Sequence, residues 1–181
     1  IKCLAEQGTQ LMLGTWQGTT VNQIRVADIF PWSRSILQSF SAPIKLAEYG
    51  VHSMININGM IYAQCGIEGR LYSCNGVQAS PIAQIPSSIS DLEAGKYLEA
   101  YPGALINYKG RIFFGISSGG TSETTDGASV WSLLQTSRGN ILTNEHGIST
   151  GNFGTTTNIK IGALCDVTKD TLLVGWKDGN A

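Results

Sequence analysis

The chain has 181 residues, of which 42% are apolar and only 14% are charged, and its formal net charge is −1. Since a globular domain usually carries roughly 25% charged residues, Ser, Thr, Asn, Gln and Gly must make up much of this surface. Lysines and arginines are never adjacent and no apolar run approaches the length of about 20 residues that spans a bilayer, so we expect neither a nucleic-acid partner nor membrane insertion.

The first predicted element is a hairpin over residues 3–16, where two short apolar runs flank a polar turn that contains glycine. A third strand is predicted over residues 23–28. A fourth, outer strand is predicted near residues 35–40, and Pro31 is expected to break the chain between strands.

The same order of elements returns over residues 52–65, with Asn58-Gly59 as the hairpin turn. We expect a loop over 66–69, a third strand over 70–74 and an outer strand near 81–85. Residues 90–96 are expected to form a single helical turn.

A third hairpin is predicted over residues 103–116, followed by a long loop over 117–128, a strand over 129–134 and an outer strand over 140–143. The last hairpin covers residues 162–176. We predict no long amphipathic helix anywhere in the chain.

The second strands of the four hairpins begin at Gln10, Met60, Arg111 and Thr171, which are 50, 51 and 60 residues apart. Four strands in a unit of about 50 residues are typical of a β-propeller blade. We therefore predict an all-β fold of four-stranded antiparallel sheets and about three and a half blades, with a sandwich or another meander as the alternative.

The approximate blades are residues 1–45, 50–100, 101–157 and 158–181, of which the last is incomplete. A propeller closes with about four to eight blades, and an open ring would expose strand edges. We expect this sequence to belong to a longer chain, or the missing strands to come from a partner.

The second copy resembles a kelch blade. The resemblance is carried by His52-Ser53-Met54, Asn58-Gly59, Ile61-Tyr62 and Leu71-Tyr72. The di-glycine of that family is replaced by Gln64-Cys65-Gly66.

Few residues indicate chemistry. His52 in a strand and His146 in a loop have no recognisable catalytic partner in the sequence. The four cysteines, which lack metal-ligand spacing, are expected to be reduced and packed in the core: Cys3, Cys65, Cys74 and Cys165. We therefore predict no catalytic residue, no cofactor and no metal.

Tryptophan is enriched at interfaces and on sugar-binding surfaces. Trp16 and Trp176 follow the second strand of their hairpins, and Trp131 lies in a third strand. These three are the candidate contacts to a partner or ligand, and packing between blades is the alternative.

We expect a non-enzymatic structural or docking module whose partners are protein subunits of a larger assembly. The low charge, the polar composition, the cysteines and the incomplete ring resemble the propeller blades of bacteriophage tail and nozzle proteins, which implies a virion protein; otherwise the chain is expected to be soluble in the cytoplasm or outside the cell. The alternatives are recognition of host-surface glycans or proteins and, third, a glycoside hydrolase or lyase. The candidate catalytic carboxylates of such an enzyme are Glu6, Asp28, Glu68, Asp126 and Asp166.

Overall fold

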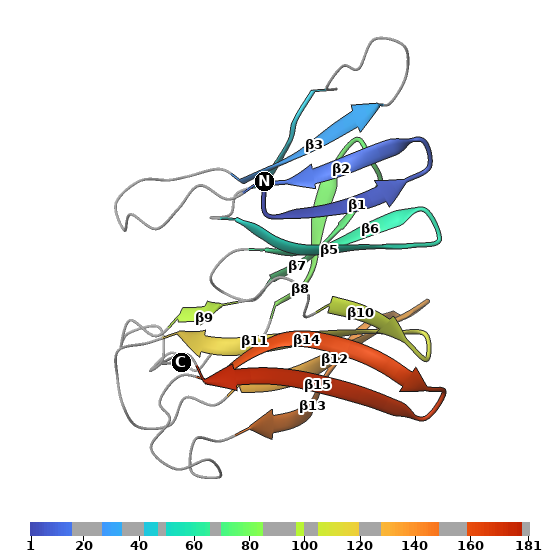
Figure 1. Ribbon diagram of the computed structural model, residues 1–181. Coiled ribbons are helices and arrows are strands. Elements are labelled where there is room, and N and C mark those ends of the chain that lie inside the picture. Colours follow the sequence, from blue (N-terminus) through green and yellow to red (C-terminus); the bar gives the residue numbers. More distant parts are fainter. Residues whose placement is uncertain are drawn as a thin grey trace. The chain divides into compact units, whose positions relative to one another are not determined.

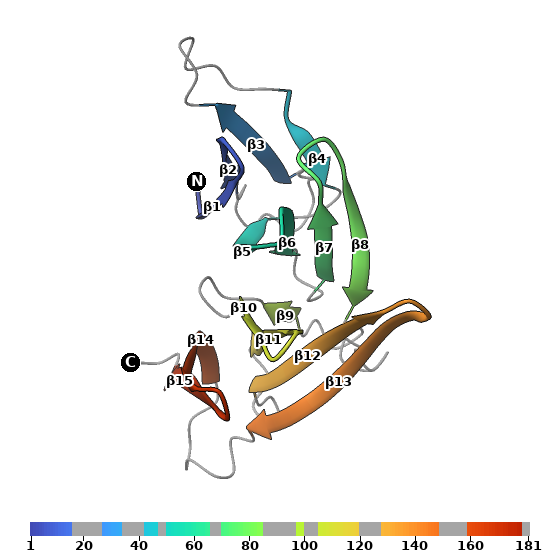
Figure 2. The same ribbon diagram turned by 90° about the vertical axis from the view of Figure 1, so that its right-hand side faces the viewer.

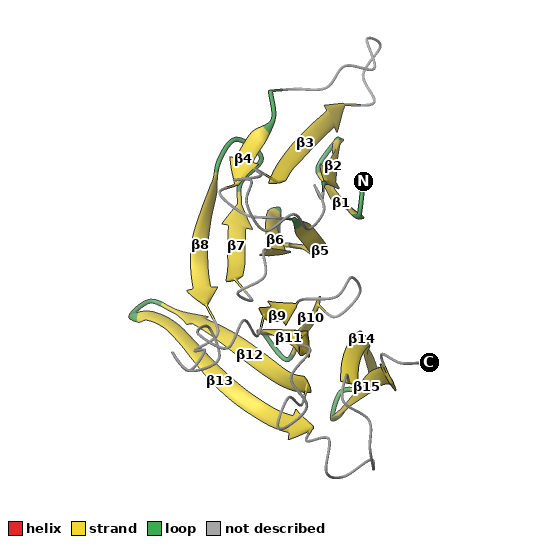
Figure 3. Cartoon of the chain, turned by 90° about the vertical axis from the view of Figure 1, so that its left-hand side faces the viewer, coloured by secondary structure: helices red, strands yellow, loops and turns green. Residues whose placement is uncertain are grey.

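The computed structural model describes residues 1–15, 27–33, 42–46, 50–65, 70–84, 97–99, 105–119, 128–148 and 159–178. All regular elements in these ranges are strands, and none is a helix (Figure 3). The same ranges accordingly contain no helix able to cross a membrane. The described chain is therefore all-β, as predicted, and it divides into two compact units, Ile1–Gln84 and Ile85–Ala181.

The first unit contains two four-stranded antiparallel sheets, in which each strand pairs with the next one along the chain (Figure 1). The first sheet consists of β1 (Cys3–Gln7), β2 (Gln10–Gly14), β3 (Ala27–Ser33) and β4 (Ile44–Leu46). The second sheet consists of β5 (Val51–Ile57), β6 (Met60–Cys65), β7 (Arg70–Cys74) and β8 (Ala79–Gln84).

The second unit contains a third sheet with the same strand order and a two-stranded sheet (Figure 2). The third sheet consists of β10 (Leu105–Tyr108), β11 (Arg111–Gly119), β12 (Ala128–Thr136) and β13 (Gly139–Ile148), and the short β9 (Tyr97–Glu99) also pairs with β11. The last sheet consists of β14 (Ile159–Thr168) and β15 (Thr171–Asp178). Among the described residues, β15 pairs with β14 alone.

All four predicted hairpins are present, and each second strand begins at the residue that the repeat analysis anchored: Gln10, Met60, Arg111 and Thr171. Two of the turns have a left-handed backbone at both central residues. The φ angles are 53° at Asn58 and 85° at Gly59, and 50° at Lys109 and 73° at Gly110. These signs match a type I′ turn, whose twist suits a two-residue hairpin.

The outer strands of the first sheet differ from the prediction. β3 shares only residues 27–28 with the predicted strand, and β4 lies after the predicted strand over 35–40, which is outside the described residues. Pro31 does not break the chain but lies within β3, past the three residues that pair with β4. Proline is tolerated where one side of a strand is unpaired.

The outer strands of the other sheets are closer to the prediction. β7 has the predicted bounds, and β8 and β12 overlap the strands predicted over 81–85 and 129–134. β13 includes the strand predicted over 140–143 and continues to Ile148. The predicted loop over 117–128 was wrong at its ends, because residues 117–119 belong to β11 and pair with β9. The predicted loop at 66–69 and the predicted helical turn at 90–96 lie outside the described residues.

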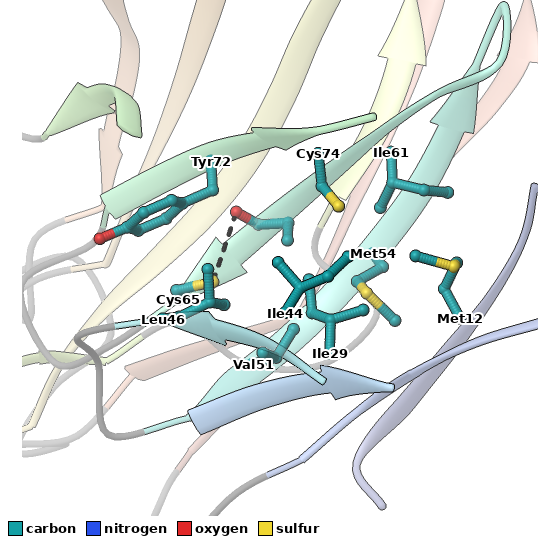
Figure 4. Close-up of a cluster of buried hydrophobic side chains, with 11 residues drawn as sticks. Met12, Ile29, Ile44, Leu46, Val51, Met54, Ile61, Cys65, Tyr72 and Cys74 are labelled. Carbon is teal, nitrogen blue, oxygen red and sulfur yellow. Dashed lines mark hydrogen bonds between the residues drawn. The ribbon is translucent and has the colours of Figure 1, made fainter. Parts of the chain in front are cut away.

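The core of the first unit lies between its two sheets (Figure 4). The first sheet supplies Met12, Ile29, Ile44 and Leu46, and the second supplies Val51, Met54, Ile61, Ala63, Cys65, Tyr72 and Cys74. Side chains alternate across a strand. Consequently Met12, the third residue of β2, faces the second sheet. Ile61 and Ala63, the second and fourth residues of β6, face the first sheet.

The second unit repeats this packing. Its core cluster consists of Val130, Ile161 and Leu164, and the side chains packed against it are Ile106, Phe113, Leu172 and Val174. Phe113 is again the third residue of its strand, and Leu172 and Val174 are the second and fourth of theirs. The same strand positions therefore make the sheet-to-sheet contact in both units.

Candidate functional site

The predicted tryptophan contacts are only partly described. Trp16 lies outside the described residues, and Trp176 lies in β15 but its side chain is outside the described part. Trp131 is half-buried in β12, opposite Phe114 on one side and Asn144 on the other. A ligand surface formed by the three tryptophans remains a prediction.

The two proposed carboxylates that the structure describes in the first unit do not lie together. Glu6 is exposed in β1 beside the hairpin turn, while Asp28 lies in β3 at the opposite end of the same sheet. Asp166 is exposed in β14, and Glu68 and Asp126 lie outside the described residues. In the described ranges, no group of three or more His, Cys, Asp or Glu side chains is placed to bind a metal ion.

The two histidines lie in strands. His52 is in β5, as predicted. His146 was predicted in a loop, but it is part of β13 and lies opposite Val130. The prediction was wrong because the pairing of β13 with β12 continues through the glycine that follows His146.

A polar cluster that sequence reasoning missed spans β11, β12 and β13. Arg111 Nη1 donates to Glu145 Oε1 at 2.8 Å and to Ser132 Oγ at 3.0 Å, and Ser132 Oγ donates to the same Glu145 oxygen at 2.5 Å. Ser132 has no exposed surface, and the Arg111 and Glu145 side chains are each 33% exposed. Because Ser132 accepts from Arg111 and donates to Glu145, the cluster links side chains of three neighbouring strands.

An irregularity in the sheet positions the carboxylate of this cluster. The register shifts between Val130 and Trp131, so that Glu145 has no residue opposite it in β12. A β-bulge redirects the side chain of the extra residue. Nothing in the sequence around Glu145 marks such a bulge, which explains why the cluster was not predicted.

The first hairpins of neighbouring sheets are joined at their turns in each unit. In the first unit, Gln7 Nε2 donates to the Gly59 carbonyl at 2.6 Å, and Asn56 Nδ2 donates to the Glu6 carbonyl at 2.5 Å. Asn56 Oδ1 also accepts the Gly59 amide at 2.9 Å, which orders the second turn. The turns of β1–β2 and β5–β6 are therefore fixed to each other.

The second unit has an equivalent connection with different chemistry. Lys109 Nζ lies 2.9 Å from Asp170 Oδ1, and the Tyr108 hydroxyl donates to the Thr168 carbonyl at 3.5 Å. The hydrogen bond to Asp170 raises the pKa of Lys109. The connected residues are again about one repeat apart, so both units join their hairpins at the same place.

A close contact holds the two sheets of the first unit together at the other end of β2. The Val51 amide donates to the Thr15 carbonyl at 2.8 Å, and Cys3 Sγ lies 3.6 Å from the Val51 carbonyl. Thr15 Oγ1 donates to the Asp28 carbonyl at 2.9 Å, which ties β3 to the same point. A Cβ at Gly14 would lie 2.6 Å from Cys3 Sγ, so a larger residue there would force its neighbours to shift.

The cysteines are all free, but they are not all in the core. Cys65 and Cys74 are buried, as predicted, and Cys3 is half-buried. Burial raises the pKa of the Cys3 thiol to about 12, which keeps this thiol protonated and unreactive at neutral pH. Cys165 is exposed, so the prediction of a core position was wrong for it, because the face of β14 that carries it has no sheet packed on it among the described residues.

The outer faces of the first and last sheets expose apolar side chains. Leu4 in β1 is 53% exposed and Leu173 in β15 is 56% exposed. By the alternation of the strands, Leu4 points away from the second sheet and Leu173 points away from the third sheet. These two faces are the best candidates for contact with a partner.

The fold and these contacts define the class: an all-β protein whose described strands form antiparallel sheets, two of which pack face to face within each unit. No protein family, curated protein or solved structure matches the chain.

Proposed function

We propose that this chain is a segment of a β-propeller that acts as a structural and docking module of a larger assembly. The observation that carries the proposal is the repeated contact between neighbouring sheets. In both units the same strand positions meet across the interface, and the first hairpins are joined at their turns. Repeats that bury one face only against a neighbour are the basis of propeller architecture.

The proposal includes a non-enzymatic role. In this proposal the cluster of Arg111, Ser132 and Glu145 has a structural role, because its side chains link three neighbouring strands. The apolar outer faces, by contrast, are suited to protein contacts. We propose a bacteriophage virion as the assembly, on the resemblance of composition and repeat cadence to tail and nozzle propellers.

A cross-linking experiment tests the propeller arrangement. A propeller requires the second and third sheets to repeat the contact seen within each unit, so the turns at Asn58 and Lys109 must be neighbours. Asn58→Cys with Lys109→Cys, in a Cys165→Ser background, should be joined by a short bis-maleimide. The matched control pairs Asn58→Cys with Arg138→Cys, which lies in the turn of the outer hairpin β12–β13. These two cysteines should not be cross-linked to each other. A cross-link in the control but not in the first pair would exclude the arrangement.

The structural role is tested on the native source material. We expect the intact mass of the native chain to be found within a large symmetric particle, as measured by mass spectrometry together with electron microscopy. A freely soluble native protein that sediments as single chains would exclude the assembly role. Saturable quenching of tryptophan fluorescence by a sugar would favour glycan recognition instead.

A further inference from the structure

The turn between β5 and β6 contains an asparagine followed by a glycine, Asn58-Gly59. Such a pair is prone to deamidation, because glycine has no side chain to hinder attack by its own nitrogen on the side-chain amide of the preceding asparagine. Asn58 and Gly59 are both exposed, so water reaches the turn. The turn therefore carries the groups that this modification needs.

The reaction consumes only water. The Gly59 nitrogen forms a bond to Asn58 Cγ and gives up its proton, while the bond from Cγ to the side-chain nitrogen breaks and that nitrogen leaves as ammonia. Water then opens the resulting succinimide at one of its two carbonyl carbons. Opening at Cγ gives aspartate, whereas opening at the main-chain carbonyl gives isoaspartate, which has one extra carbon in the backbone.

The reacting glycine is held on both sides in the folded chain. Its amide donates to Asn56 Oδ1 at 2.9 Å, and its carbonyl accepts from Gln7 Nε2 at 2.6 Å. Attack requires the amide to lose its proton and to turn its nitrogen towards Asn58 Cγ. The hydrogen bond to Asn56 must therefore break before the reaction can begin.

Both bonds depend on contact with the first sheet. Gln7 is the last residue of β1, and Asn56 Nδ2 donates to the Glu6 carbonyl in the same strand at 2.5 Å. Asn56 thus links the backbone of the first sheet to the reacting amide in the second sheet. Separation of the two sheets would release the Gly59 carbonyl from Gln7 and remove the bond that holds Asn56 in place.

A second pair of this kind, Asn75-Gly76 in the turn between β7 and β8, is arranged differently. Asn75 Oδ1 accepts the amides of Val77 and Gln78 at 3.0 Å each. Here the side chain that would be attacked is held by its own turn, and these bonds do not involve the first sheet. The chain therefore contains an internal comparison for Asn58.

We propose that Asn58 is a latent deamidation site, which Asn56 protects for as long as the first two sheets stay in contact. Isoaspartate lengthens the backbone of a two-residue turn, so the original turn cannot form again after the modification. Modified Asn58 accumulates in chains whose first two sheets have separated. The inference is independent of the proposed function, since it uses only contacts within the first unit.

Incubation of the 181-residue chain at mildly alkaline pH tests the proposal, with deamidation of each asparagine followed by peptide mapping and mass spectrometry. In the unaltered chain, Asn58 should react more slowly than in the urea-denatured chain. Asn56→Ala should raise the rate at Asn58 by roughly 2- to 13-fold, the ratio that corresponds to one typical hydrogen bond. The rate at Asn75 should stay the same in this variant.

The matched control is Asn107→Ala. Asn107 is exposed and precedes Gly110 by three residues, as Asn56 precedes Gly59, but it belongs to the other unit, so the rate at Asn58 should not change. An unchanged rate at Asn58 in Asn56→Ala would overturn the proposal. An equal increase at Asn58 and Asn75 would also overturn it, because protection would then come from folding as a whole.

Gln7→Ala tests the dependence on the first sheet. This variant frees the Gly59 carbonyl while leaving Asn56 in the chain, and it should also raise the rate at Asn58. An unchanged rate would contradict protection by the sheet contact. Circular dichroism of each variant establishes that it is folded.

Discussion

Replacing Gly14 with alanine should weaken the contact between the first two sheets. The added Cβ would lie 2.6 Å from Cys3 Sγ and 2.8 Å from Val51 Cγ1, both closer than real Cβ contacts. Val51 is fully buried, and its amide is held by the Thr15 carbonyl, so it cannot easily move away. The methyl group must therefore push the two sheets apart.

The size of the effect follows from two opposing terms. Overpacking of a core costs about 1–3 kcal/mol. Loss of the conformational freedom of glycine in the unfolded chain offsets about 0.4–1 kcal/mol of this. We expect Gly14→Ala to lower the free energy of unfolding by roughly 1–2 kcal/mol, which corresponds to a fall in Tm of about 2–8 °C for a chain of this size.

Urea denaturation monitored by circular dichroism measures this loss. The matched control is Gly162→Ala in β14, where a Cβ would meet nothing within 4 Å. Because the unfolded chain loses the freedom of glycine here too, this variant should be more stable than the unaltered protein by about 0.4–1 kcal/mol. Cys3→Ala combined with Gly14→Ala should regain part of the loss, because it removes the closest contact. If Gly14→Ala were no less stable than Gly162→Ala, the packing argument would be refuted.

Three further outcomes are expected. Burial raises the pKa of Cys3 from 9.0 to about 12, so the thiol loses its proton at a lower pH in the unfolded chain than in the folded one. The stability that the protonated thiol contributes is therefore present below pH 9. It is lost at up to about 1.4 kcal/mol per pH unit between pH 9 and about 12. Urea titrations of Cys3→Ala should show a shallower alkaline loss, and an unchanged slope would contradict the assignment. Glu145→Ala should lower the free energy of unfolding by about 1–2 kcal/mol, because it leaves the Arg111 guanidinium without its charged partner; in a double-mutant cycle with Arg111→Met the two losses should be less than additive, and strict additivity would show that the pair is not coupled. In native protein a thiol reagent should modify the exposed Cys165 at once and the buried Cys65 only after unfolding, as followed by mass spectrometry; equal rates would contradict the burial of Cys65.

Local sequence was sufficient to place the inner hairpins. Asn58-Gly59 and Lys109-Gly110 supply the left-handed backbone that a two-residue turn needs, and the apolar residues on either side alternate. Both signals come from residues that are adjacent in the chain, so the starts of the four second strands could be predicted.

The outer strands depended on longer-range pairing. β3 extends through Pro31 because β2 pairs with residues 29–33, and β13 extends to Ile148 because β12 continues opposite it. A long connection separates β2 from β3, and Ile148 pairs with the end of β12 that is farthest from their shared turn. The local breaker signals therefore misplaced these boundaries.

The sequence by itself determined the repeat, the inner hairpins and the all-β class, because turn propensity and side-chain alternation act between near neighbours. Only the tertiary structure decided that Arg111, Ser132 and Glu145 meet, since a bulge far from Arg111 in sequence redirects the carboxylate. It also decided that Cys165 is exposed while Cys65 is buried, although both lie in apolar strands. The physical reason is that burial depends on whether another sheet packs on a strand's face, and a single strand contains no information about that neighbour.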